Sequence, residues 1–165
     1  MTIQSILDDV LAREGGYVDV PQDRGGCTNM GITRQTLHDW RGVPVTCEDL
    51  KNLTRTEALE IYRELYVTRP GFDLIRDVRL RALLIDFGVH SGPRTAIRAL
   101  QRVIGAEADG RIGRETLAKI QTVTASEIYR LVLQSRVLYL ADLLRRDPTQ
   151  RVFAAGWFRR MADFL

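Results

Sequence analysis

Two carboxylates, Glu14 and Asp23, stand nine residues apart in the most motif-rich stretch of the 165-residue sequence. The apolar residues before Glu14 recur at the spacing of one helical face, at Ile3, Ile6, Leu7, Val10 and Leu11. Glu14 continues this face, so a helix that ends there directs a carboxylate toward the core. Asp23 falls among turn-forming residues and is expected to be solvated. Two carboxylates in such different surroundings suit acid and base roles, and glycosidic bond cleavage needs such a pair.

The elements that must position these acids follow from the residues around them. Gly15 and Gly16 end the first helix, because glycine readily adopts the left-handed backbone found past a helix end. Residues 17–20 predict a short strand, residues 21–25 a turn, and residues 26–30 a second strand. Thr33 is a suitable cap for a following helix that ends before Gly42. We therefore expect a helix end, a hairpin and a new helix around the two acids.

This stretch resembles the signature of the family 108 glycoside hydrolases, which are the N-acetylmuramidases of phage endolysins and of some bacterial release systems. The matching residues are Glu14-Gly-Gly-Tyr17, then Asp23 to Thr28 with Gly25-Gly26, then Gly31-Ile-Thr33. The order Glu14, Asp23, Thr28 is also similar to the Glu, Asp, Thr triad of phage lysozymes, with a gap from Asp23 to Thr28 that is one residue shorter.

The resemblance implies a function and a set of site residues. Hydrolysis of the β-1,4 bond between N-acetylmuramic acid and N-acetylglucosamine in peptidoglycan is expected, with inversion at the anomeric carbon. Glu14 would be the general acid, Asp23 would position water, and Thr28 would help to hold that water. Tyr17 and Asn29 would contact the substrate. A non-catalytic peptidoglycan-binding or scaffold protein on the same fold is the alternative.

The implied fold is mainly α, a lysozyme-like helical bundle with one small β-hairpin beside the active-site cleft. Residues 1–165 are expected to form a single domain. Within it, residues 86–165 include a segment similar to the family's peptidoglycan-binding region, marked by Leu100-Gln101, Asp109-Gly110 and Thr116. These residues suit glycan contacts and a structural helix-loop-helix connector equally well. His90 stands where the family often has asparagine.

Four other side chains have both a functional and a structural interpretation. The 78–91 region predicts a buried helix, and Asp86 inside it is either a third active-site acid or, as we favour, a carboxylate paired with arginine. Tyr62 and Tyr66, at helical spacing, fit a core or groove wall better than a sugar platform. Trp40 fits either role.

Composition limits the partners and cofactors. The net charge of +3 and the pI of about 9.1 suit an anionic polymer, either peptidoglycan or nucleic acid. A helix face with Arg94, Arg98 and Arg102 raises nucleic-acid binding as a rival function, but no nucleic-acid motif accompanies it, so we expect peptidoglycan and no nucleic acid. The two histidines and two cysteines have no metal-ligand spacing, which predicts no metal, no cofactor and reduced thiols. We also expect a monomer.

The N-terminal residues lack the basic segment and apolar core of a signal peptide, and no apolar run approaches the length of a membrane span. Synthesis in the host cytoplasm without a signal peptide is therefore expected, with no stable membrane insertion. The family resemblance implies that a holin permeabilises the membrane before the protein acts on the cell wall, in phage-type host lysis.

Overall fold

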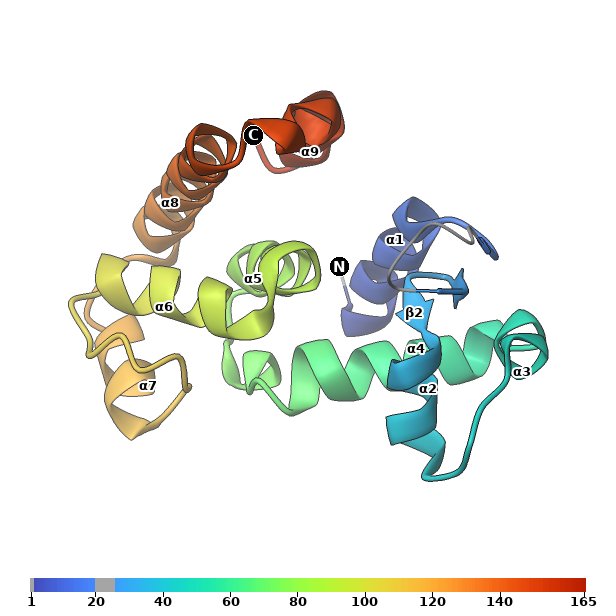
Figure 1. Ribbon diagram of the computed structural model, residues 1–165. Coiled ribbons are helices and arrows are strands. Elements are labelled where there is room, and N and C mark those ends of the chain that lie inside the picture. The colour runs from blue at the N-terminus through green and yellow to red at the C-terminus, as the bar shows by residue number, and fades with distance from the viewer. Residues whose placement is uncertain (1, 20–25) are drawn as a thin grey trace. The chain divides into compact units, whose positions relative to one another are not determined.

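The structure is a computed structural model that describes residues 2–19 and 26–165, so Asp23 lies outside the described residues. It forms two compact units, the N-terminal unit (Met1–Arg69) and the C-terminal unit (Pro70–Leu165), each of which is described by itself (Figure 1). Because two compact units can share one domain, the single domain expected over residues 1–165 stays a prediction. No helix among the described residues is long and apolar enough to cross a membrane.

The N-terminal unit is helical apart from one small sheet. Its elements are α1 (Ile3–Glu14), β1 (Thr28–Asn29), β2 (Ile32–Thr33), α2 (Arg34–Arg41), α3 (Cys47–Lys51), α4 (Arg55–Arg63) and the π-helix η1 (Glu64–Thr68). The C-terminal unit contains the 3-10 helix η2 (Phe72–Leu74), α5 (Val78–Ser91), α6 (Pro93–Val103), α7 (Arg114–Ile120), α8 (Ala125–Arg146), the 3-10 helix η3 (Pro148–Phe153) and α9 (Ala154–Ala162). The predicted mainly α fold with one small hairpin is confirmed.

Side-chain caps explain where the helices begin. The predicted cap Thr33 accepts a hydrogen bond from a backbone N–H group in the first turn of α2, and Thr46 and Thr54 do the same for α3 and α4. These bonds satisfy donors that have no partner within the helix. Asp77 does the same for α5. α1 ends at Glu14, as predicted, but Gly15 has φ of 78° and ψ of −167°, which is not the left-handed helical conformation that was expected there.

The hairpin lies later in the sequence than expected. Thr28 pairs with Thr33 and Asn29 with Ile32, so the two-residue turn consists of Met30 and Gly31. Of the expected pairing between residues 17–20 and 26–30, the described residues contain one bridge, in which Val18 and Thr28 exchange backbone hydrogen bonds of 2.8 Å. Met30 and Gly31 both have positive φ, 49° and 71°, as in the tight turns that match strand twist. The prediction missed this turn because methionine rarely adopts positive φ.

The expectation of reduced thiols is wrong. Cys27 and Cys47 form a disulfide with a Cα–Cα distance of 5.9 Å. The two residues meet because α3 packs against β1, where the Asn29 amide also donates to the Leu50 carbonyl at 2.9 Å. A low cysteine count argues against a network of disulfides, but it does not report whether packing brings one pair of sulfur atoms together.

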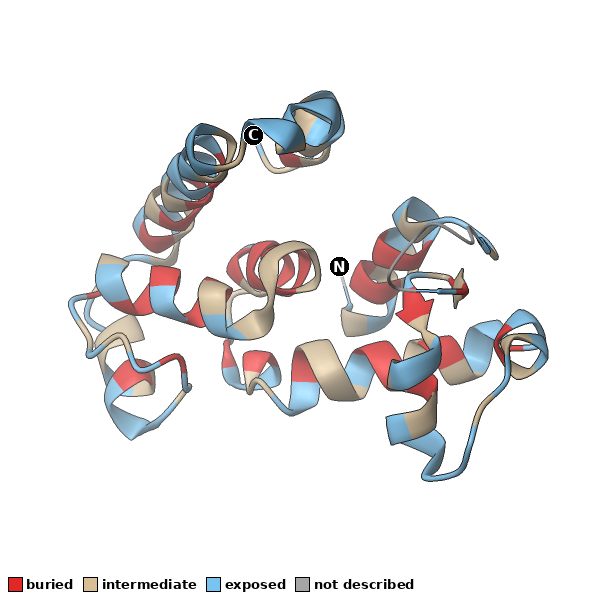
Figure 2. Ribbon diagram, in the orientation of Figure 1, coloured by how far each residue is buried: buried red, intermediate tan, exposed pale blue. Residues whose placement is uncertain are grey.

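The C-terminal unit is built around α5, whose residues from 82 to 88 are all buried (Figure 2). Asp86 is 1% exposed and lies 2.8 Å from the Arg136 guanidinium of α8 and 2.9 Å from Arg160 of α9. The Arg136 guanidinium also packs over the Phe87 ring, at 5.3 Å from its centroid. The ion-pair interpretation of Asp86 is therefore confirmed, because its carboxylate joins α5 to both α8 and α9.

His90, on the last turn of α5, lies close to this network. Its ring contacts Trp157 edge to face, with ring centroids 5.4 Å apart. Burial lowers the pKa of His90 to about 4, and the positive charges of Arg136 and Arg160 act in the same direction while Asp86 opposes them. The folded state therefore keeps this imidazole neutral over a pH range in which an unfolded histidine binds a proton.

The His90→Asn variant should remove a pH-dependent contribution to stability. Between pH 6.5 and pH 4 the unfolded wild type binds a proton at position 90 that the folded state does not, so stability must fall as the pH falls through this window. The free energy of unfolding of wild type relative to His90→Asn should therefore be largest above pH 6.5 and smallest near pH 4. Urea titrations at pH 7.5 and 4 measure it. A difference between wild type and His90→Asn that stays constant over this pH range would contradict a buried, neutral His90.

Reduction of the disulfide should destabilise the N-terminal unit by about 3 kcal/mol, from the chain entropy of a closed loop with a sequence separation of 20 residues. The measurement compares urea denaturation of the wild type with and without reductant. A Cys27→Ala, Cys47→Ala double variant is the control, and its denaturation midpoint should not respond to reductant. Two freely alkylated thiols in the folded, unreduced wild type would contradict the pairing.

Candidate active site

The candidate general acid Glu14 is the last residue of α1 and is half-buried. Ile6, Leu7, Val10 and Leu11 bury the apolar face of α1, and this face packs against α4. Glu14 continues the same face at the end of the helix, and its side chain is half-buried there. The sequence pattern predicted this placement correctly.

The Met30–Gly31 turn packs directly onto Glu14. A Cβ atom built on Gly31 would lie 3.0 Å from Glu14 Oε2 and 3.2 Å from Glu14 Cβ, and still closer to the hydroxyl oxygen of Tyr62. No residue larger than glycine fits this position without displacing one of these groups. Glycine is therefore needed at position 31 both for its positive φ and for this close approach.

Two tyrosines form the other side of the site. Tyr62, on the last turn of α4, donates a hydrogen bond to the Met30 carbonyl at 3.0 Å. The Tyr66 ring packs on Tyr62 with centroids 5.2 Å apart, and burial raises the pKa of Tyr66, with a further contribution from the negative charge of Glu14. Tyr66 belongs to η1, and π-helical turns often occur at functional sites. The sequence located both tyrosines on a helix, but their spacing did not reveal that they lie at Glu14.

The other predicted site residues lie on the segments next to this cluster. Thr28 is half-buried in β1 between Val18 and Thr33. Tyr17 lies beside the Val18 bridge, and its hydroxyl donates to Asp19 Oδ2 at 3.2 Å. Asn29 is buried, and its amide nitrogen donates to the Leu50 carbonyl, which gives it a structural contact whether or not it also meets a substrate. With Asp23 outside the described residues, the inverting mechanism stays a prediction.

The motif residues of the C-terminal unit form an internal hydrogen-bond network. Buried Gln101 donates to Asp109 Oδ1 at 2.7 Å and to the Arg111 carbonyl at 2.9 Å, and its Oε1 accepts from the Gly110 N–H at 2.9 Å. The Thr116 hydroxyl lies 3.1 Å from the same amide nitrogen. These contacts favour the structural interpretation of the motif, since they fix the loop between α6 and α7.

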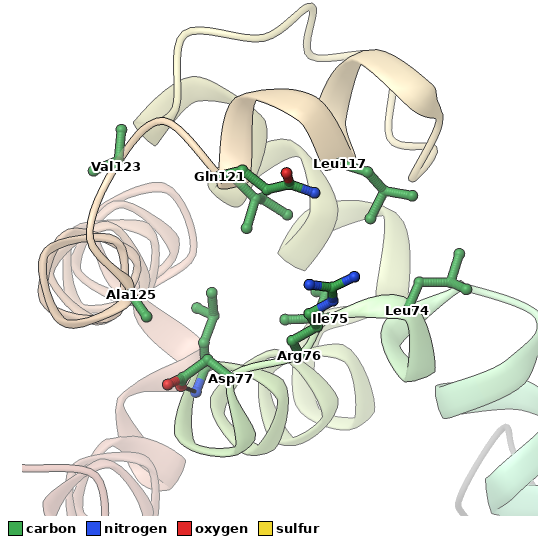
Figure 3. Close-up of a pocket in the computed structure, with 10 residues that line it drawn as sticks. Leu74, Ile75, Arg76, Asp77, Leu117, Gln121, Val123 and Ala125 are labelled. Carbon is green, nitrogen blue, oxygen red and sulfur yellow. Dashed lines mark hydrogen bonds between the residues drawn. The ribbon is translucent and has the colours of Figure 1, made fainter.

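A cavity of about 200 Å³ in the C-terminal unit lies between the segment before α5 and the end of α7 (Figure 3). Arg76 and Gln121 occupy opposite walls, and most of the remaining lining is aliphatic. The carboxylate of Asp77 accepts the Leu80 N–H at 2.8 Å as a helix cap. This cavity therefore lacks a pair of available acids. Within residues 2–19 and 26–165, no three His, Cys, Asp or Glu side chains gather in a group that could hold a metal ion.

A helical unit with a glutamate at a helix end, packed against a two-stranded hairpin, is the arrangement of lysozyme-like glycoside hydrolases. The model of the family described as glycosyl hydrolase 108 matches residues 7–92, and the model described as a predicted peptidoglycan domain matches residues 95–162. The structure of Brucella abortus SagA is 37% identical, with a TM-score of 0.83 over 98% of this chain and 90% of that one. No curated protein matches.

The chain belongs to the glycosyl hydrolase 108 family, as the sequence resemblance predicted. The two family matches together identify a peptidoglycan hydrolase or peptidoglycan-binding protein, with peptidoglycan as its partner.

Gly31→Ala and Gly42→Ala form a matched pair that tests the contact with Glu14. Both glycines have nearly the same φ, 71° and 69°, so both variants should lose about 1 to 2 kcal/mol through left-handed strain. Gly42 has nothing within 4 Å of the added methyl group, whereas Gly31 meets Glu14 and Tyr62. We therefore expect activity on peptidoglycan to fall at least about tenfold in Gly31→Ala, or about 1.4 kcal/mol in the barrier, and to stay near wild type in Gly42→Ala. Turbidity clearance and thermal melts measure both effects, and equal activity in the two variants would contradict this packing.

Proposed function

We propose that the protein is an N-acetylmuramidase that hydrolyses the β-1,4 bond between N-acetylmuramic acid and N-acetylglucosamine in peptidoglycan. The observation that carries this proposal is the position of Glu14, at the end of α1 and in contact with the Met30–Gly31 turn, in a chain of the glycosyl hydrolase 108 family.

In the proposed reaction Glu14 donates a proton to the glycosidic oxygen while the sugar ring develops positive charge. Asp23 positions a water molecule on the opposite face of the ring, and Thr28 helps to hold this water. Attack from the opposite face inverts the configuration of the anomeric carbon. Tyr17, directly before Val18, and Asn29, directly after Thr28, contact the glycan strand beside the bridge that joins these two segments.

The contacts around Glu14 support the role of a positioned acid. Gly31 and Tyr62 restrict the space that its carboxyl group occupies, and Tyr62 is itself held by the Met30 carbonyl. A proton donor that is already oriented loses little freedom when the substrate binds, which lowers the barrier to proton transfer.

We further infer that the protein acts on the wall outside the cytoplasmic membrane as a monomer. Synthesis in the host cytoplasm and holin-dependent permeabilisation of the membrane would precede this step, in phage-type lysis. The Cys27–Cys47 disulfide supports a site of action outside the cytoplasm, because disulfides persist in oxidising compartments such as the periplasm.

The match of residues 95–162 to a predicted peptidoglycan domain also favours the second candidate, a protein that binds peptidoglycan without cleaving it. Only the first candidate requires the carboxyl group of Glu14.

Glu14→Gln should abolish hydrolysis while leaving the fold unchanged, because the amide keeps the shape of the side chain but supplies no acidic proton. Glu60→Gln, at an exposed glutamate of α4, is the matched control and should retain wild-type activity. The assay incubates purified peptidoglycan with each variant and measures new reducing ends, with circular dichroism as the check on folding. Reducing ends released by Glu14→Gln at more than a few per cent of the wild-type rate would exclude Glu14 as the acid.

In the wild-type reaction, NMR of fresh product should show the α-anomer, whereas the β-anomer would exclude inversion.

A further inference from the structure

A second cavity, of about 390 Å³, lies in the N-terminal unit between α2 and η1. Its lining residues are Thr36, Asp39 and Trp40 from α2, Glu64 and Leu65 from η1, and Arg69 directly after η1. The volume lies within the range of small-molecule binding pockets. The mechanism proposed above uses none of these side chains.

Both walls of the cavity continue into the segments that contact Glu14. On one side, α2 follows β2 without a break, and the Thr36 hydroxyl lies 2.9 Å from the Thr33 hydroxyl, two residues after Gly31. On the other side, Glu64 and Leu65 precede Tyr66 in the same turn of η1. The cavity is therefore joined to the candidate acid through short stretches of chain on both sides.

The lining combines an aromatic face with hydrogen-bonding groups. Trp40 is 39% exposed, although an indole is among the largest apolar groups that a protein can bury. Asp39 accepts one hydrogen bond, from Gln35 at 2.7 Å, and its carboxylate has capacity for more. Glu64 faces Arg69 at 3.6 Å, and both side chains are partly exposed. An indole face matches the apolar C–H face of a pyranose ring, and the carboxylates and guanidinium can bond its hydroxyl groups.

The charges of the lining select among the sugars of the wall. Two carboxylates and one guanidinium leave a net negative charge, which disfavours an acidic ligand. N-acetylmuramic acid carries a lactyl group and an acidic peptide, whereas N-acetylglucosamine is neutral. We propose that this cavity is a subsite for an N-acetylglucosamine unit of the glycan strand, with Trp40 as its stacking platform and Asp39 and Glu64 as hydroxyl acceptors. The assignment rests on the proposed function for its substrate.

The two tryptophans of the chain allow a direct test. In a Glu14→Gln background, which permits binding without turnover, Trp157→Phe leaves Trp40 as the single indole. Titration with chitotetraose should then give a saturable change in fluorescence. The matched variant Trp40→Phe keeps Trp157, which packs against His90 in the C-terminal unit, and should show no change. A saturable change from Trp157 with none from Trp40 would overturn the proposal, as would no change from Trp40 at saturating ligand.

Should Trp157→Phe fail to fold, the difference between the Glu14→Gln titration and the Glu14→Gln, Trp40→Phe titration isolates the same signal. A soluble stem peptide serves as the second probe, because its amino groups could also bind the two carboxylates. A Trp40 signal for the peptide and none for chitotetraose would overturn the assignment to a sugar.

Kinetics on peptidoglycan supply an independent measurement. With Glu14 intact, Trp40→Ala should raise KM about fivefold or more while kcat falls by less than twofold, and Trp40→Phe should recover part of the loss. A fall in kcat with unchanged KM would overturn the subsite.

The binding and catalytic conclusions can fail separately, because the binding signal is recorded in the inactive Glu14→Gln protein. A saturable Trp40 signal in the Glu14→Gln protein, together with no cleavage of peptidoglycan by the wild type, would refute only the proposed function.

Discussion

The left-handed backbone at Met30 and Gly31 is the constraint on which the candidate site depends. Met30 has a φ of 49°, a conformation that costs a non-glycine residue of the order of 1 kcal/mol or more. The Tyr62 hydroxyl compensates for part of this cost by donating to the Met30 carbonyl, and the absence of a side chain on Gly31 lets Tyr62 and Glu14 meet the turn. One tight turn therefore fixes the hairpin, holds Tyr62 in place and limits the space available to the carboxyl group of Glu14.

Burial of charge organises the C-terminal unit in a comparable way. Asp86 is the shared anion of two guanidiniums, and Arg136 is fully buried. Removal of the carboxylate would take a close anion away from the Arg136 guanidinium in a low-dielectric interior, which costs far more than a surface ion pair is worth. Burial, together with the positive charges of Arg136 and Arg160, lowers the pKa of His90 and keeps it neutral. Gln101 is a buried polar side chain without charge, and its amide hydrogen-bonds the backbone of the loop between α6 and α7.

Much of the fold could be predicted from the sequence, because helix ends depend on local chemistry. Thr33, Thr46, Thr54 and Asp77 cap their helices, and Pro93 opens α6, as their residue types indicate. The position of the hairpin was missed because the turn places a methionine at positive φ. The disulfide was missed because it depends on how α3 packs against β1, which is tertiary information. The position of Glu14 followed from helical periodicity, but the approach of Tyr62 and Tyr66 did not, since their spacing fits a core helix equally well.

Gly31 lies against both Glu14 and Tyr62, the charge of Glu14 acts on Tyr66, and all four residues belong to the N-terminal unit. The disulfide belongs to the same unit, and Cys27 directly precedes Thr28, which both Val18 and Thr33 flank. Its bond to the first residue of α3 therefore anchors the start of β1, the strand that leads into the Met30–Gly31 turn. Among the described residues of the N-terminal unit, the Cys27–Cys47 disulfide, the strained Met30–Gly31 turn and the hydrogen bond of Tyr62 therefore all contribute to the geometry around Glu14. In the C-terminal unit, by contrast, Gln101 and Thr116 are buried in contacts that hold a loop. If that unit binds the wall, exposed side chains must make the contacts, because these buried motif residues are already occupied.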